Sequence, residues 1–342
     1  MKPLLGVRVV EFEGIGPGPL GSRMLVDMGA EVTVIARPGP GAINSRLGNR
    51  EGDNPLRRGK TLVELNLKEA EDLAQARAIV SASDVLIEGN RPGVMERLGL
   101  GPAVCAEWNP RLIYARMTGW GQDGPLAHAA GHDVNYVALS GALSLSARPG
   151  ERPIIPPTVL GDAGGALGMC FGIACALLQA RQTGQGCVVD AAISDVMASL
   201  GGLAQWVVAS GGLGGPKPSA FHDSPFYDVY TCRDGLHISL GALEPQFYAL
   251  LLQKLGWDDV DPKAQYDTQQ WPQWKARLSA QIASQPRAHW EALFEGSDVC
   301  FGSVLTMAEA AEHPHNVARG NFMRDSLGGI QTRAAPRFLP LA

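Results

Sequence analysis

The first 36 residues alternate between strand and helix patterns, and this alternation limits the chain to few folds. Residues 6–11 (GVRVVE) begin with a glycine and are rich in β-branched residues, and residues 31–36 (EVTVIA) are also rich in β-branched residues. Between them, a helical pattern runs from Leu20 to Met28 and ends at Gly29. A strand, a helix and a second strand in this order are typical of an open parallel sheet. The opening therefore predicts a Rossmann-like α/β fold.

The same alternation continues through about residue 120. Strand patterns recur at 61–67 (TLVELNL), 84–89 (DVLIEG) and 111–119 (RLIYARMTG), separated by a charged helix at 68–82 and a short helix after Pro92. Further along, residues 163–181 and 191–209 indicate two long apolar helices, joined by the strand-like stretch GQGCVVDAA at 184–192. We therefore expect the fold class to be α/β with an open parallel sheet.

The composition changes at residues 211–220 (GGLGGPKPSA), which hold four glycines and two prolines and have the character of a linker. Residues 226–242 then indicate a β-hairpin that turns around Arg233, Asp234 and Gly235, and amphipathic helices follow. We expect a large domain over 1–205, to which 318–342 return, a linker at 206–220, and a smaller α+β domain with a second linker over 221–317.

Charge and cysteine content exclude several functional classes. The formal net charge of −5 leaves no overall basic field for nucleic acid or an anionic membrane. The N-terminus lacks the pattern of a signal peptide, and the apolar run at 163–178 falls short of the ~20 residues that span a bilayer, so we expect a buried helix there. The six cysteines show neither a CxxC pair nor metal-ligand spacing. We expect reduced thiols, no metal, and a cytoplasmic protein.

Gly14, Gly16 and Gly18 suggest a dinucleotide-binding turn, but the rest of the motif is missing. Position 19 holds proline where close packing of helix on strand requires the third glycine. The second strand ends in Ala36 and Arg37 instead of the acidic residue that holds a ribose hydroxyl. This excludes NAD. Arg37 suits a ribose phosphate, such as that of NADP or of the 3′-phosphorylated ADP of coenzyme A, or it is a surface arginine before a turn.

Other basic residues fit the same phosphate-bearing end of a ligand. Arg57, Arg58 and Lys60 precede the strand at 61–67, and Arg91 follows the strand at 84–89. We expect them at strand ends on one side of the sheet, where such folds bind ligands. Each is alternatively a solvated surface charge.

His132, Asp162 and Glu244 form a candidate acid–base set. Each also has a structural explanation: Asp162 is placed to cap the helix that follows it, Glu244 can complement a helix dipole, and His132 can be a half-buried histidine. Taken together, the three residues suggest acid–base catalysis. A carboxylate at a helix start lies near backbone amides that can hold an enolate oxygen, while a histidine supplies a second base near neutral pH. Two bases on opposite faces of one carbon interconvert its two configurations.

Five longer segments of the sequence resemble a known enzyme family. The segments LAHAAGHDVNYVALSGAL (126–143), GDAGGALGMCFGIACALLQARQTGQGCVVDAAISD (161–195), SDVLIEGNRPGVMERLGLGP (83–102), NPRLIYARMTGWGQDGP (109–125) and GALEPQFY (241–248) closely resemble the α-methylacyl-CoA racemases of the class III CoA-transferase family. The resemblance covers most of the chain. It implies a large CoA-binding domain and a small domain in an interlocked homodimer, with the active site shared between chains.

The resemblance also implies a role for each residue. His132 would be the base that faces the α-proton of the S substrate, helped by Glu244 of the partner chain, and Asp162 would face that of the R substrate. Arg37 and Lys60 would meet the nucleotide phosphates, and coenzyme A would enter only as part of an acyl-CoA substrate, with no other cofactor. The path of the CoA would be lined by Glu64, Leu65, Asn66, Leu67, Asn90 and Arg91, and its thioester end by Gly131, Asp133, Val134, Asn135 and Tyr136.

Two alternatives remain open. In a CoA transferase of the same fold, Asp162 would be a covalent nucleophile and His132 would not be required. A non-catalytic acyl-CoA-binding protein would keep affinity for CoA without proton exchange.

Overall fold

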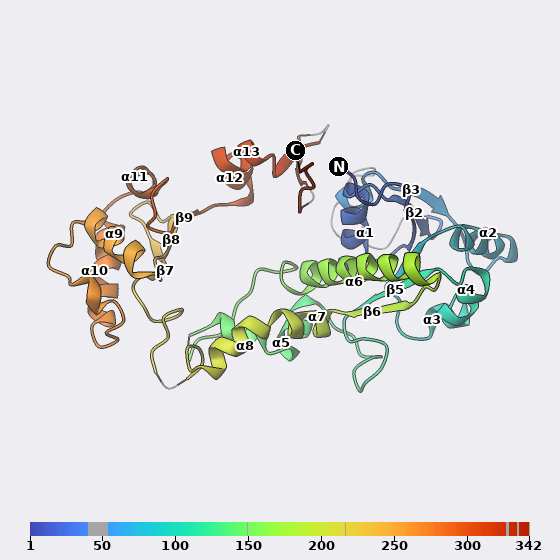
Figure 1. Cartoon of the computed structure of the whole chain (residues 1–342), viewed down its shortest axis with the longest axis horizontal. Helices are drawn as coiled ribbons and strands as arrows, with labels where there is room; N and C mark the ends of the chain where they lie inside the picture. Colours follow the sequence, from blue (N-terminus) through green and yellow to red (C-terminus); the bar gives the residue numbers. More distant parts are fainter. Residues whose placement is uncertain (40–53, 149, 216, 326–327, 334, 342) are drawn as a thin grey trace. The chain divides into compact units, whose positions relative to one another are not determined.

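The computed structural model describes residues 1–39, 54–148, 150–215, 217–325, 328–333 and 335–341. The chain divides into two compact units, drawn together in Figure 1. Unit 1 comprises Met1–Ser146, Pro153–Gly201 and Gln331–Ala342, and unit 2 comprises Ala147–Arg152 and Gly202–Ile330. The short excursion of the chain into unit 2 at Ala147–Arg152 has no counterpart in the sequence pattern. The domain boundaries expected at 205 and 318 stay a prediction.

Unit 1 is built on one six-stranded parallel sheet. Its strands are β1 (Arg8–Phe12), β2 (Glu31–Ala36), β3 (Thr61–Glu64), β4 (Val85–Glu88), β5 (Ile113–Thr118) and β6 (Val188–Ala192). They lie in the order β3-β2-β1-β4-β5-β6, with every neighbouring pair parallel. This is the strand order of Rossmann sheets, and it confirms the predicted α/β class with an open parallel sheet.

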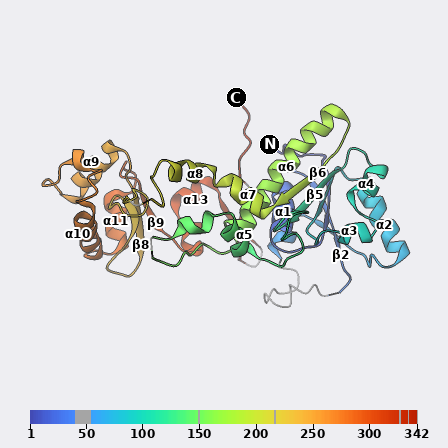
Figure 2. The same cartoon turned by 90° about the horizontal axis from the view of Figure 1, so that it is seen from below.

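Helices cover both faces of this sheet, because alternate residues of each strand point to opposite sides. Val9, Ile87 and Ile113 pack with residues of α1 (Pro17–Asp27) and α6 (Gly161–Thr183). Their neighbours Val10, Leu86 and Tyr114 pack instead with α2, α3 and α4. Figure 2 shows α6 running beside β5 and β6, which it contacts. The remaining helices of this unit are α2 (Ala70–Ser81), α3 (Val94–Arg97), α4 (Pro102–Trp108), α5 (Asp133–Leu139) and α7 (Ile193–Leu200), with the 3-10 turns η1 (Pro55–Arg57) and η2 (Ala142–Ser146).

The long apolar helix α6 differs from the fully buried helix that the sequence predicts. Met169 and Ile173 lie in the core, but Leu167, Phe171 and Leu178 are 54%, 71% and 60% exposed. Within the described residues, α6 is the single helix whose length and apolar composition would suffice to cross a membrane, a test that core helices also pass. These three exposed residues lie on one face of α6, which therefore presents apolar side chains at the surface of the described part of the chain.

The predicted helix over 191–209 is wrong in two places. Ala191 and Ala192 extend β6, where they pair with Met117 and Thr118 of β5. The helix that follows, α7, ends at Leu200 with Gly201 as its C-cap, and α8 (Gly202–Ala209) is a separate helix in unit 2. The adjacent glycines explain the break, because glycine interrupts helices at a cost of about 1 kcal/mol each.

Unit 2 has the α+β character expected of the smaller domain. The predicted hairpin is confirmed as β7 (Tyr227–Thr231) and β8 (His237–Gly241), and β9 (Phe301–Val304) joins β8 to complete an antiparallel sheet. Aromatic residues such as Phe226, Trp271 and Trp290 fill the core. The other elements are α9 (Pro245–Leu255), η3 (Pro262–Ala264), α10 (Trp271–Ala283), α11 (Arg287–Phe294), α12 (Met307–Glu312), α13 (Pro314–Arg319) and β10 (Phe322–Arg324). The last strand, β11 (Ile330–Thr332), begins at the end of unit 2 and continues into unit 1.

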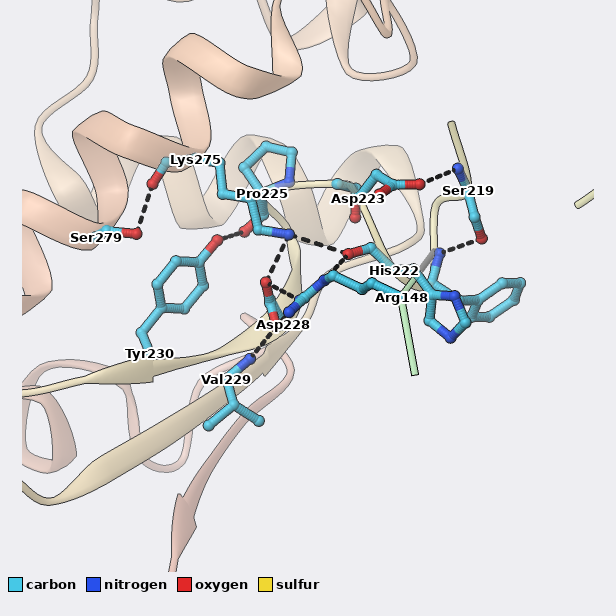
Figure 3. A network of polar contacts seen from close by, with 12 residues as sticks. Arg148, Ser219, His222, Asp223, Pro225, Asp228, Val229, Tyr230, Lys275 and Ser279 are labelled. Atoms are coloured by element: carbon cyan, nitrogen blue, oxygen red, sulfur yellow. Dashed lines mark hydrogen bonds and ion pairs between the residues drawn. The ribbon is translucent and has the colours of Figure 1, made fainter. Parts of the chain in front are cut away.

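An ion cluster holds the excursion at 147–152 within unit 2 (Figure 3). Nη2 of Arg148 donates to both carboxylate oxygens of Asp228, at 2.7 and 2.6 Å, and its Nε donates to the carbonyl of His222 at 2.7 Å. Nζ of Lys275 approaches the same carboxylate at 2.6 Å. One aspartate therefore anchors two cations from segments far apart in the sequence.

Candidate active site

A cavity of about 480 Å³ opens at the carboxyl edge of the sheet in unit 1. Its walls include Ile15–Pro17 after β1, Gly89–Pro92 after β4, and Gly119 and Trp120 after β5. The chain leaves β1 toward the face covered by α1 and leaves β4 toward the face covered by α3. When neighbouring strands connect to helices on opposite faces of the sheet, a crevice forms at the carboxyl ends of these strands. Open α/β sheets bind their ligands in this crevice.

Two of the three predicted acid–base residues line this cavity. His132 is the residue before α5, and Asp162 is the second residue of α6. The two helices contact one another, so residues thirty positions apart in the sequence meet in one hollow. The structure thus brings a histidine and a carboxylate to the same pocket, as two-base chemistry requires.

Asp162 does not cap α6, which excludes the structural explanation considered from the sequence. The N-cap residue is Leu160, and no side-chain bond caps the helix. Burial raises the pKa of the Asp162 carboxyl group, the negative charge of Asp133 raises it further, and His132 opposes both. A carboxyl group with a raised pKa holds a proton closer to neutral pH, so it can act as an acid as well as a base.

The amides at the start of α6 are already engaged. The N–H of Asp162 donates to Oδ1 of Asp133 at 2.7 Å, and the N–H groups of Ala163 and Gly164 donate to the carbonyls of Thr158 and Leu160 at 3.0 Å each. The expectation that these amides would hold an enolate oxygen is therefore wrong for these three residues. The turn that precedes α6 and the side chain of Asp133 satisfy them instead.

The segment before His132 is held by side chains of α5. The hydroxyl of Tyr136 donates to the carbonyl of Gly131, and the N–H of His132 donates to Oδ1 of Asn135 at 3.0 Å. The Tyr136 ring packs edge-on against Trp120, with centroids 4.7 Å apart. A side-chain carbon at Gly119 or Gly131 would lie 2.1 or 2.7 Å from this ring, so both positions require glycine. The first turn of α5 thus fixes the backbone that presents His132.

The residues predicted to bind CoA lie largely along the same edge of the sheet. Arg37 follows β2 and is exposed, Glu64 ends β3, and Asn90 and Arg91 follow β4 and line the cavity. After β3, Leu65 is buried, whereas Asn66 is exposed and its N–H donates to Asp72. In α5, Asp133 is buried and Val134 is exposed. Asn135 faces a second hollow beside Trp120, together with Ala138 and Leu139.

Arg57, Arg58 and Lys60 do not lie where the sequence placed them. They precede β3, at its amino end, and each has a protein partner. Nζ of Lys60 lies 2.7 Å from Oε2 of Glu11 and donates to Oγ of Ser22, with the side chain only 2% exposed. Arg57 pairs with Glu13, and Arg58 donates to Gln331. The ammonium group of Lys60 is therefore occupied by a buried carboxylate in this structure and is not turned toward a phosphate.

Glu244 belongs to unit 2, where it is exposed at the N-cap of α9 without making a side-chain capping bond. Its partnership with His132 stays a prediction. Among the residues that the structure describes, no group of three or more His, Cys, Asp and Glu side chains is placed to hold a metal ion.

Sequence reasoning missed several cavity residues. The pattern around Gly16 suggests a nucleotide motif, yet in the structure Gly16 faces Asp162, and Trp120 lines the cavity without having been predicted. The signal for Trp120 was present, since the sequence Gly-Trp-Gly directly follows β5 at the edge where ligands bind. The apolar wall residues Ile15, Met117 and Ile193 carry no local signal, because any core position has the same character.

Comparison with known proteins assigns the chain to a family. The model of CoA-transferase family III matches residues 4–340. The chain is 40% identical to α-methylacyl-CoA racemase of Homo sapiens over 98% of this chain and 86% of that protein. The mouse racemase is also 40% identical, over 97% of this chain and 86% of that protein. The present chain is also 32% identical to acetyl-CoA:oxalate CoA-transferase of Acetobacter aceti, over 98% of this chain and 88% of that protein. A crystal structure of a CaiB/BaiF family protein from Brucella suis, 26% identical, matches with a TM-score of 0.84 over 98% of this chain and 93% of that chain.

Proposed function

Since the chain belongs to CoA-transferase family III, we propose that it is an α-methylacyl-CoA racemase that interconverts (2R)- and (2S)-2-methylacyl-CoA thioesters. The reaction is a 1,1-proton transfer between two bases through an enolate. The observation that carries this proposal is that His132 and Asp162 line one cavity at the carboxyl edge of the sheet.

Each base has a defined task in either direction. His132 in its neutral form removes the α-proton of the S substrate, and the electron pair moves into the thioester carbonyl to form the enolate. Asp162 in its protonated form then returns a proton to the opposite face of the same carbon. The R substrate reacts in reverse, with Asp162 as base and His132 as acid. A positioned proton transfer contributes a factor of about 10² to 10⁴ to the rate.

The substrate is an acyl-CoA thioester, and its polar end follows the carboxyl edge of the sheet. Arg37 meets the nucleotide phosphates, and Asn90 and Arg91 guide the chain into the cavity that they line. Ile15, Met117 and Ile193 supply apolar surface for the acyl group. Coenzyme A is part of the substrate, and the reaction needs no further cofactor.

The working form is an interlocked homodimer in the cytoplasm. The exposed apolar face of α6, with Leu167, Phe171 and Leu178, supports burial against a second chain, because large apolar patches mark interaction surfaces. In the dimer, Glu244 from the partner chain orients His132. The cysteines among the described residues are free thiols, as a reducing compartment allows.

A CoA transferase is the second candidate, because a relative named as one is 32% identical. In a transferase, Asp162 attacks the thioester carbonyl, which forms an acyl–aspartyl anhydride and releases CoA thiolate. The thiolate then attacks the aspartyl carbonyl and releases the donor acid. The free carboxylate finally attacks the resulting aspartyl thioester, and the thiolate that this step releases takes the new acyl group from the second anhydride and frees Asp162. Asp162 serves both mechanisms, so a variant of Asp162 does not separate them. His132 does.

The deciding experiment incubates each enantiomer of a 2-methylacyl-CoA with the protein in D₂O and follows deuterium and configuration at C2. The racemase incorporates deuterium and inverts the centre. His132→Ala should lower this rate by at least the factor of about 10² that a positioned base supplies. His128→Ala is the matched control, since His128 lies in the same loop but does not line the cavity.

Other outcomes overturn the proposal. CoA movement to an added carboxylate without exchange at C2 identifies a transferase. Binding of the thioester with neither reaction identifies a non-catalytic binding protein.

A further inference from the structure

One carboxylate joins the two helix starts that carry the bases. Asp133 directly follows His132 in the chain, and its Oδ1 accepts the hydrogen bond from the N–H of Asp162 at 2.7 Å. Asp133 is 8% exposed, so water competes little for this bond. A side-chain carbon at Gly161 would lie 2.5 Å from the same oxygen, so the contact is possible only because that position is glycine. The relative position of the two bases therefore depends on the Asp133 side chain.

The same contact sets the charge around Asp162. The ionisable groups that face the Asp162 carboxyl group are Asp133, His132 and Tyr136, all from the α5 segment. The turn before α1 brings Gly16 against it, without a charge. No salt bridge to Asp133 occurs among the described residues. A negative charge without a neutralising partner thus lies next to the reacting carboxylate.

We propose that Asp133 is a positioning residue that holds the start of α6 on the start of α5 and keeps a fixed negative charge beside Asp162. This role goes beyond contact with the thioester, and it rests on the proposed function, in which Asp162 and His132 exchange one proton between them.

The charge serves a reaction that runs in both directions. One direction starts from ionised aspartate with protonated histidine, and the other starts from protonated aspartate with neutral histidine. An ordinary carboxyl group loses its proton at a much lower pH than an ordinary imidazolium does, so without a shift at Asp162 the second arrangement would be rare. Burial raises the pKa of Asp162, and the charge of Asp133 raises it further, so the protonated form of Asp162 becomes less rare. Asp133 thereby makes the protonated Asp162 accessible.

The test compares Asp133→Asn, which keeps an oxygen acceptor for the Asp162 amide but removes the charge, with Asp133→Ala, which removes both. Asp195→Asn is the control, because it removes an exposed charge of unit 1 that does not face Asp162. Two measurements are made on the full-length protein: the titration of the Asp162 carboxyl group by ¹³C NMR with labelled aspartate, assigned with Asp162→Asn, and the pH profile of kcat/KM for racemisation.

In Asp133→Asn, we expect the pKa of Asp162 to fall and the acid limb of the profile to move to lower pH. Asp133→Ala should in addition lose kcat across the whole profile, because α6 is no longer held. Asp195→Asn should leave both measurements unchanged. A purely structural Asp133 would lower the rate without moving the acid limb.

An unchanged Asp162 titration in Asp133→Asn overturns the inference, and an acid limb that stays in place does so too. The NMR titration does not depend on turnover, so the two proposals fail separately. If the pKa of Asp162 falls but the wild-type protein exchanges no α-proton, the racemase proposal is refuted while the electrostatic role of Asp133 stands.

Discussion

Gly16 lies against Asp162 in the wall of the cavity, and a side-chain carbon at Gly16 would lie 3.5 Å from Oδ2 of Asp162. Gly16 also has φ of 66°, in the left-handed region that non-glycine residues enter at a cost of about 1 to 3 kcal/mol. The glycine that resembles part of a nucleotide motif thus allows the turn before α1 to approach the Asp162 carboxyl group closely.

Gly16→Ala should therefore lower kcat for racemisation at least about tenfold, because relief of the backbone strain at φ 66° shifts the turn that packs against Asp162 and misaligns this base with the substrate. Gly18→Ala is the matched control: Gly18 lies two residues further along, in the first turn of α1, and an added carbon there meets nothing within 4 Å. It should keep activity and unfold at the same or a higher temperature, because alanine favours helix. Equal losses in the two variants would contradict the explanation.

Tyr136→Phe should separate positioning from stability. The variant keeps the ring against Trp120 but loses the hydrogen bond to the Gly131 carbonyl, at a cost of about 1 kcal/mol in unfolding free energy. Because Gly131 precedes His132, we also expect a lower kcat. Tyr230→Phe removes an equivalent bond to the Pro225 carbonyl in unit 2, and it should lower stability alone. Stability is followed by urea unfolding and kcat by loss of optical activity.

The Glu11–Lys60 ion pair should contribute to stability and not to CoA affinity. Both side chains are at most 3% exposed, so Lys60→Met leaves a buried carboxylate without its cation, at a cost of about 3 to 5 kcal/mol. Pairing this change with Glu11→Gln should recover part of the loss, which urea unfolding of both variants would show. If Lys60→Met instead weakened CoA binding and left unfolding unchanged, Lys60 would serve the phosphates as the sequence suggested.

The raised pKa of Asp162 predicts a stability cost at neutral pH. A carboxyl group whose folded-state pKa lies above its unfolded value of about 3.9 destabilises the fold as pH rises through that folded-state value, and it costs nothing when both states are protonated. Asp162→Asn should therefore be more stable than the wild type at pH 7 and equally stable near pH 3, while it loses racemisation. Urea unfolding at the two pH values measures the difference, and a gain that is the same at both would rule out this cause.

The Arg148–Asp228–Lys275 cluster should hold the excursion at 147–152. Asp228→Asn leaves two partly buried cations without their anion, so unit 2 should unfold at a lower temperature. Asp259→Asn removes the acceptor of an exposed pair with Arg277 and should have a smaller effect. Equal shifts in melting temperature would show that the cluster adds no more than a surface pair.

The sequence identified the sheet and its strands because those signals are local. Strands that are buried on both faces, such as 31–36 and 84–89, stand out as short runs of β-branched residues between turns, and the hairpin turn around Gly235 is fixed by adjacent residues. His132 and Asp162 could be proposed for the same reason, since each lies in a segment that resembles a known family.

The tertiary structure alone decided what these residues touch. Contacts between segments far apart in the chain decide that Lys60 meets Glu11 and that Asp133 accepts the hydrogen bond from the Asp162 amide. They also decide that Leu167, Phe171 and Leu178 of α6 are exposed. The net charge and the hydrophobic pattern are the same whether a lysine faces a phosphate or a buried carboxylate. The sequence therefore determined which groups are available for chemistry, whereas packing determined which of them meet in the cavity and with what charge beside them.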